Sequence, residues 1–69
     1  MNNVNTEKAI NEIKYKIISL DRLIKIQLDY MQQYYKITGD IPSDVESAQL
    51  ISYRDQKQFA LSILETLEP

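Results

Sequence analysis

Hydrophobic residues recur at alternating steps of three and four positions through the first half of the chain. The series is Ile10, Ile13, Ile17, Leu20, Ile24, Gln27, Met31 and Tyr34. These are the a and d positions of a heptad, the pattern of a helix that packs lengthwise against another helix. Leu23, Tyr30 and Ile37 at the g positions widen the apolar stripe. The pattern predicts one long helix over about residues 7–38.

A glycine and a proline interrupt this pattern, and the signals of a second helix follow. Gly39 suits the left-handed residue that ends many helices, and Pro42 disfavours a helical residue before it. Ser43 and Glu46 form the signature of a capping box, in which the acidic side chain reaches back to the N-cap residue. Because the connection is short, the two helices are expected to run antiparallel. The predicted fold class is all-α, an antiparallel two-helix hairpin (αα-hairpin) assembling into a helical-bundle oligomer.

The hairpin accounts for almost the whole chain as a single domain. Thr6 is the expected N-cap of the first helix, because a threonine side chain can accept a hydrogen bond from the first turn. The expected organisation is a flexible N-terminus at residues 1–5 and one hairpin domain at 6–69, with helices at about 7–38 and 44–67 and a turn at 39–43.

Apolar residues outside the heptad stripe indicate a second contact surface on the first helix. Ile18 and Ile26 lie at positions b and c, and are either isolated surface residues or contacts for another subunit. The second interpretation is favoured, because a helix of ~32 residues, about 48 Å long, cannot be covered on both sides by one shorter helix. A dimer of hairpins gives a four-helix bundle, and a higher oligomer is the alternative. The expected oligomer interface comprises Ile10, Ile13, Ile17, Ile18, Leu20, Ile24, Ile26 and Met31.

The second helix is apolar towards both ends and polar in its middle. Residues 52–58 contain no aliphatic side chain. This stretch is either a solvated segment, with or without a small kink, or a polar window in which a ligand or partner is recognised. The sequence does not decide whether the helix is continuous there.

Composition removes most catalytic chemistry. The 69-residue chain has no Cys, no His and one Gly. The commonest general base and the thiol nucleophile are therefore absent, together with the ligands of a structural zinc site and any glycine-rich phosphate loop. The acidic residues show no clustered pattern along the chain. The sequence predicts no enzymatic activity, no metal and no cofactor.

Net charge and hydropathy argue against two further classes of protein. The net charge of −2 is unsuited to a protein that coats DNA. No apolar run approaches the ~18 residues of a membrane span, and no signal-peptide pattern is recognisable. The expected location is the cytoplasm, or the host-cell cytoplasm if a phage encodes the protein.

Tyrosines and cations are the candidate ligand contacts. A tyrosine ring can stack on a nucleotide base, and Lys or Arg can bind a phosphate. For each cation the alternative is an ordinary solvated surface charge. The candidate ligand-binding residues are Lys14, Tyr35, Tyr53, Arg54 and Lys57.

Three features follow one another along the chain in a recognisable order. They are Ile10-Asn11-Glu12-Ile13-Lys14 early in the first helix, the turn around Gly39-Asp40, and a second helix that ends close to Pro69. This order resembles that of small phage proteins that sequester the cyclic nucleotide signals of bacterial defence, the anti-CBASS sponges. Lys14 and Asn11 match the motif, whereas the aromatic-proline segment that often precedes the first helix is missing. The resemblance implies a homo-oligomer that binds a cyclic dinucleotide in pockets between subunits.

Two other functions fit the same residues. A small helical inhibitor or adaptor would dock on a larger host protein, with Ile18, Ile26 and Tyr35 as its anchors. The third hypothesis is a purely structural bundle module. The sequence alone barely separates the first two of these three hypotheses.

Overall fold

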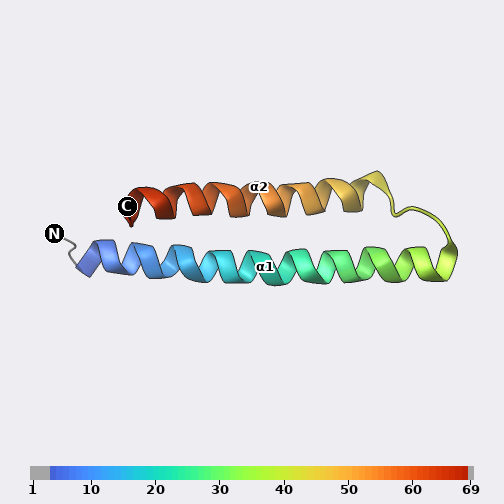
Figure 1. Cartoon of the computed structure of the whole chain (residues 1–69), viewed down its shortest axis with the longest axis horizontal. Coiled ribbons are helices and arrows are strands. Elements are labelled where there is room, and N and C mark those ends of the chain that lie inside the picture. Colours follow the sequence, from blue (N-terminus) through green and yellow to red (C-terminus); the bar gives the residue numbers. More distant parts are fainter. Residues whose placement is uncertain (1–3, 69) are drawn as a thin grey trace.

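Residues 4–68 of the computed structural model form two helices, α1 (Val4–Thr38) and α2 (Asp44–Leu67). The helices lie side by side and antiparallel, so the N- and C-terminal ends of the chain lie at the same end of a rod (Figure 1). The rod measures 55 × 15 × 15 Å. This confirms the predicted all-α hairpin, while its assembly into an oligomer stays a prediction.

The first helix begins earlier than the sequence pattern predicts. It starts at Val4 rather than at about residue 7, so Thr6 lies within its first turns instead of at the N-cap. Val4 and Asn5, expected to be flexible, are helical, and residues 1–3 lie outside the described residues. A capping residue is a preference worth only about 1 kcal/mol. Because no Gly or Pro precedes Thr6, nothing stops the helix from continuing past it.

The turn between the helices has the bounds that the sequence predicts, residues 39–43. Gly39 adopts a positive φ of 72°, the left-handed conformation that favours glycine. Its N–H donates a hydrogen bond of 2.8 Å to the Tyr35 carbonyl, and the Thr38 hydroxyl donates one of 2.8 Å to the Tyr34 carbonyl. The Gly39 bond satisfies one of the last four carbonyls of α1, which would otherwise be left unpaired.

A side-chain contact across the first turn marks the start of α2. The Glu46 carboxylate accepts hydrogen bonds from the Ser43 backbone N–H at 2.9 Å and from the Ser43 hydroxyl at 3.1 Å. This is the backward reach of the acidic residue that the capping-box signature predicts. The helix then runs unbroken to Leu67. The polar stretch at residues 52–58 is therefore not a break between two helices.

The core is a single line of contact between the two helices. Four residues are buried in it: Ile10, Leu20, Leu50 and Ala60. None of the described side chains is completely enclosed. The helices have unequal lengths, 35 and 24 residues, and α1 extends beyond α2 at both ends (Figure 1). One hairpin therefore covers only one side of α1.

Two residues of the predicted oligomer interface belong instead to the core of the single chain. Ile10 is 5% exposed and Leu20 is 3% exposed, so α2 already covers them and no second chain can reach them. The heptad stripe thus specifies the contact between α1 and α2. The polar member of that stripe, Gln27, donates a hydrogen bond of 3.2 Å to the Glu46 carbonyl, which ties the middle of α1 to the first turn of α2.

Shortening a core residue should destabilise the hairpin far more than shortening an outward-facing one. Leu20→Ala is expected to lower the free energy of unfolding by about 2–3 kcal/mol, because it leaves a cavity in the core between the two helices. Ile26→Ala removes as many carbon atoms from an exposed position and should change it by less than about 0.5 kcal/mol. Urea denaturation followed by circular dichroism measures both, and equal losses would contradict the single-line core.

Candidate interaction surfaces

The five candidate ligand residues do not meet on one chain. Tyr35 lies near the turn and Lys14 near the opposite end, about 30 Å apart along α1 at 1.5 Å per residue. Tyr53 is half-buried on α2 and accepts a hydrogen bond of 2.9 Å from the Gln49 side chain, while Arg54 beside it is exposed. Tyr53, Arg54 and Lys57 are neighbours within about one turn of α2, whereas Lys14 and Tyr35 lie far apart on α1.

Two of the candidate cations already have carboxylate partners. Lys14 pairs with Glu68 at 3.1 Å, and Lys57 pairs with Asp21 at 2.6 Å. Each pair joins α1 to α2 along the same edge of the hairpin, which we call the ion-paired edge. Exposed pairs of this kind contribute only about 0–1 kcal/mol each. They do, however, occupy the charges that a phosphate would need.

A line of exposed apolar residues runs along the side of α1 that faces away from α2. Four of its members recur every eleven residues, close to three helical turns, so they stay on one side of the helix. Their exposed fractions, together with that of Ile18, range from 51% to 80%. We call this line the outer stripe: Val4, Tyr15, Ile18, Ile26 and Ile37. Ile18 and Ile26 are thus outward-facing, as expected for a second contact surface.

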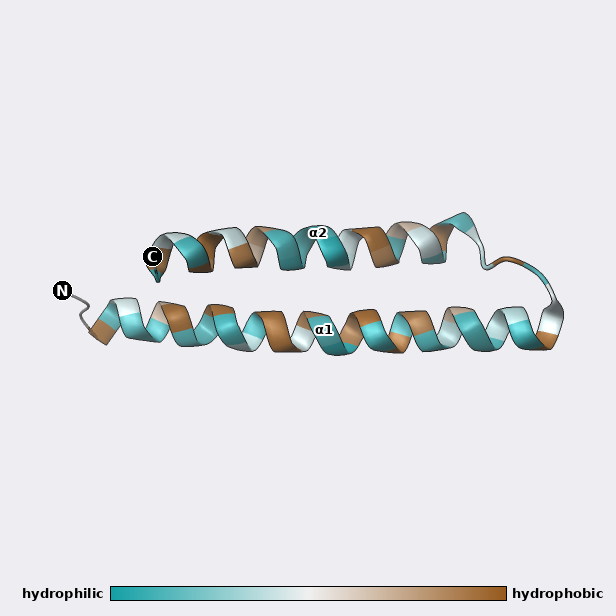
Figure 2. Ribbon diagram, viewed as in Figure 1, coloured by the Kyte–Doolittle hydropathy of each residue, from teal (hydrophilic) through white to brown (hydrophobic). Residues whose placement is uncertain are grey.

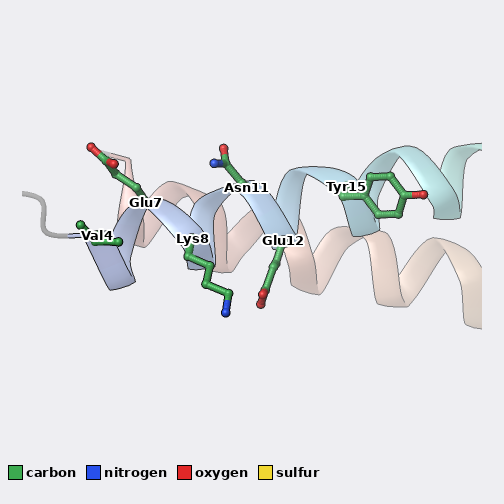
Figure 3. A pocket seen from close by; sticks show the side chains of 6 residues that line it. All are labelled: Val4, Glu7, Lys8, Asn11, Glu12 and Tyr15. Carbon is green, nitrogen blue, oxygen red and sulfur yellow. The ribbon is translucent and has the colours of Figure 1, made fainter.

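A shallow hollow occupies the N-terminal end of the outer stripe. Figure 3 shows Val4 and Tyr15 at its two ends, with Glu7 and Asn11 along one border. All of its lining residues come from α1, and α2 lies behind that helix. Its volume is about 570 Å³. Val4 and Tyr15 are its apolar borders, and Glu7, Lys8, Asn11 and Glu12 complete its lining.

A second apolar surface lies across both helices, opposite the ion-paired edge. Its centre is a groove of about 280 Å³ to which α1 contributes Ile13 and Lys16, and α2 contributes Phe59 and Ile63. Lys16 stands about 200° around the helix from Lys14, which places the groove away from the ion pairs. Leu23 and Tyr30 follow Lys16 at steps of seven and extend this surface towards the turn. We call it the groove face: Ile13, Lys16, Leu23, Tyr30, Gln56, Phe59, Ala60 and Ile63.

The sequence pattern contained a sign of the groove face but did not identify it. Leu23 and Tyr30 were expected to widen the heptad stripe, and both are in fact partly exposed beside it. Phe59 is 69% exposed, although its spacing from Ile63 is that of a packed apolar row. The rotation and axial shift of α2 against α1 determine which α2 residues lie beside Leu23 on the groove face. The helical repeat of the sequence does not specify that rotation or shift.

Tyrosines gather towards the turn end of the groove face. The rings of Tyr30 and Tyr34 lie 6.3 Å apart between centroids and are tilted by 35°. The Glu46 carboxylate raises the pKa of Tyr30, first by accepting a hydrogen bond from its hydroxyl and then by the repulsion of a phenolate. Glu46 thus contacts both the N-cap of α2 and an aromatic residue of α1.

A third hollow lies where α1 extends past α2. Leu28, Met31 and Tyr35 border it from α1, and Ile41 and Pro42 border it from the turn. Its volume is about 380 Å³. Tyr35 therefore stands beside apolar residues rather than beside the other candidate ligand contacts. Figure 2 shows that hydrophobic segments recur along both helices, in keeping with several apolar surfaces.

Three findings concern metal binding, membrane spanning and similarity to known proteins. Within residues 4–68, no group of three or more His, Cys, Asp or Glu side chains is placed to hold a metal ion. No helix of that part of the chain has the length and apolar character needed to cross a membrane. The chain matches no protein-family model, and no curated protein or solved structure shows significant similarity to it.

The contact between Tyr30 and Glu46 predicts a specific change in titration. The Glu46 carboxylate favours the neutral form of the Tyr30 phenol. The contact therefore stabilises the folded hairpin below the ordinary tyrosine pKa of about 10, and this stabilisation is lost as the pH rises through the raised pKa of Tyr30. Glu46→Gln should lower the pKa of Tyr30 by removing the negative charge. Carbon NMR of labelled tyrosine rings measures the pKa of Tyr30 in both proteins, and the distant Tyr15 signal serves as the internal control. An unchanged Tyr30 titration would contradict the contact.

Proposed function

We propose that this chain is a non-enzymatic, cytoplasmic docking module that binds a larger protein through the outer stripe of α1. The observation that supports the proposal is an exposed apolar line on the side of α1 that α2 does not cover. Its members recur on one side of a single helix, and exposed apolar anchors aligned in this way suit contact with a groove of another protein. The function is thus that of an adaptor or inhibitor, which acts by occupying a surface of its partner.

The spacing of the outer stripe indicates the shape of the partner surface. Successive eleven-residue anchors such as Tyr15 and Ile26 stand about 16 Å apart along the helix. A helix with such anchors fits an elongated apolar groove, the mode in which many regulatory helices bind. Tyr15 is the anchor best suited to the centre of the contact, since tyrosine is enriched among residues that dominate binding energy.

The charges beside the anchors indicate the chemistry of the groove border. Lys8 follows Val4 by four residues, and Arg22 precedes Ile26 by four, so both cations lie along the outer stripe. Glu7 and Glu12 border the hollow at the N-terminal end of the same stripe, so the matching partner groove carries charges of both signs along its border. Such rim charges set the association rate and orientation more than the final affinity.

Cyclic dinucleotide capture receives less support from the single chain. A ligand with two phosphates and two bases needs cations and aromatic faces that converge. The structure separates Tyr35 from Lys14 and gives Lys14 and Lys57 carboxylate partners. Capture would need a second chain to complete every pocket, whereas the outer stripe is complete on one chain.

Charge substitutions on the outer stripe should abolish docking without unfolding the hairpin. A photoreactive benzophenone side chain at position 26 should cross-link one partner, and the same group at exposed position 58 on α2 should not. With that partner purified, Ile18→Glu and Ile26→Glu should each raise Kd by about tenfold or more, because each buries a charge in an apolar contact. Gln58→Glu is the matched control.

Two results would contradict docking through the outer stripe. One is recovery of the same protein from positions 26 and 58 alike. The other is a Kd for the purified partner that neither isoleucine substitution changes. Circular dichroism of each variant establishes that a loss of binding is not a loss of helix.

Calorimetry with cyclic dinucleotides distinguishes docking from ligand capture. Since Tyr35 lies far from the other candidate contacts and Lys14 and Lys57 are ion-paired, no heat is expected at ~100 μM ligand, a concentration at which a Kd of about 100 μM or tighter is detected. Saturable heat at one ligand per two chains would instead favour capture between subunits. Tyr53→Ala and Arg54→Ala would then be expected to reduce it.

A further inference from the structure

The groove face is not used by the proposed docking and has a different chemical character from the rest of the hairpin. Both ion pairs between the helices, Lys14–Glu68 and Asp21–Lys57, lie along the opposite edge. Of the residues that line the groove, Lys16 alone is charged. The ion-paired edge and the groove face thus lie on opposite sides of the hairpin, one charged and one largely apolar, as expected for half of a helical bundle.

We propose that the groove face binds the groove face of a second copy of this chain, antiparallel, with a two-fold axis beside Leu23. The product is a four-helix bundle of two hairpins. This inference is independent of the proposed docking, because the outer stripe lies on another side of α1.

The spacing of the groove face is self-complementary about Leu23. Lys16 precedes Leu23 by seven residues and Tyr30 follows it by seven, each about 10 Å away along the helix. A two-fold axis at Leu23 places the Lys16 end of one copy over the Tyr30 end of the other. The two copies meet Leu23 to Leu23, at a side chain that is 40% exposed in the single hairpin.

The two ends of the groove face also match in shape. The end around Ile13, Phe59 and Ile63 is hollowed into the groove of about 280 Å³. The other end carries the paired rings of Tyr30 and Tyr34. Antiparallel packing seats a tyrosine pair in each groove, so an aromatic side chain fills each apolar hollow.

Charge complementarity fixes the antiparallel direction. Within residues 4–68, Lys16 forms no ion pair, while Glu46 sits beside the Tyr30 hydroxyl at the other end of the groove face. The two-fold axis brings Lys16 of one copy to Glu46 of the other, twice per dimer. Parallel packing would instead set the two Lys16 side chains against each other.

The thin core gives the dimer its driving force. Among residues 4–68, four residues are buried and no side chain is completely enclosed, so the single hairpin achieves little apolar burial. Small scaffolds without disulfides or metals commonly obtain the missing burial by self-association. Covering the groove face encloses Phe59 and Ile63 and adds a second layer of contacts beside the line of contact between α1 and α2.

Cysteine cross-linking tests the axis directly, because the chain contains no native cysteine. Leu23→Cys should form a disulfide dimer under mild oxidation, since two-fold symmetry brings the two Cα atoms within the roughly 7 Å that a disulfide allows. Ile26→Cys is the matched control, more exposed but on the outer stripe. We expect at least about tenfold faster cross-linking at position 23 than at position 26. Equal rates, or faster cross-linking at position 26, would overturn the proposal.

Sedimentation equilibrium of the unmodified chain tests the assembly and its direction. The unmodified chain should sediment as a dimer at micromolar concentrations, and a monomer throughout would overturn the proposal. Lys16→Gln should weaken the dimer by about tenfold, because the lost ion pair occurs twice. Lys25→Gln removes the same charge from an exposed position elsewhere on α1 and should leave the dimer unchanged. A stronger dimer for Lys16→Gln would indicate parallel packing and overturn the antiparallel one.

Discussion

The seam between α1 and α2 is the contact on which every other property of this hairpin depends. Two helices can share only one line of contact, and here that line buries Ile10 and Leu20 of α1 against Leu50 and Ala60 of α2. A hydrophobic residue on the side of either helix that faces away from this line has no partner on the other helix. The exposed apolar surfaces are therefore a direct result of this two-helix architecture.

The surfaces divide according to which helices contribute to them. The outer stripe belongs to α1 alone, so it is a property of one helix and survives any change in the packing of α2. The groove face needs both helices in register, with Ile13 of α1 beside Phe59 and Ile63 of α2. Association through the groove face thus depends on a folded hairpin, whereas the outer stripe requires only that α1 be helical.

The heptad from Ile10 to Tyr34, the glycine at position 39 and the Ser43–Glu46 pair were enough to predict both helices and the turn, because each is a local signal. The start of α1 was predicted three residues too late, because an N-cap residue such as Thr6 favours a helix start at its position but does not require one. The partners of Lys14 and Lys57, and the groove beside Ile13, depend on the axial register of α2 on α1. That register follows from the summed packing of the seam, which no short stretch of sequence contains.

The tight turn at Gly39 also determines the order in which the hairpin can form. Residues near the turn are close in sequence, so their contacts cost little chain entropy, while Lys14 and Glu68 are 54 residues apart. The contacts between α1 and α2 should therefore form first beside the turn and last at the opposite end of the hairpin, and they should break first at that opposite end. Amide hydrogen exchange should be slowest beside the Gln27–Glu46 contact and fastest at the open end.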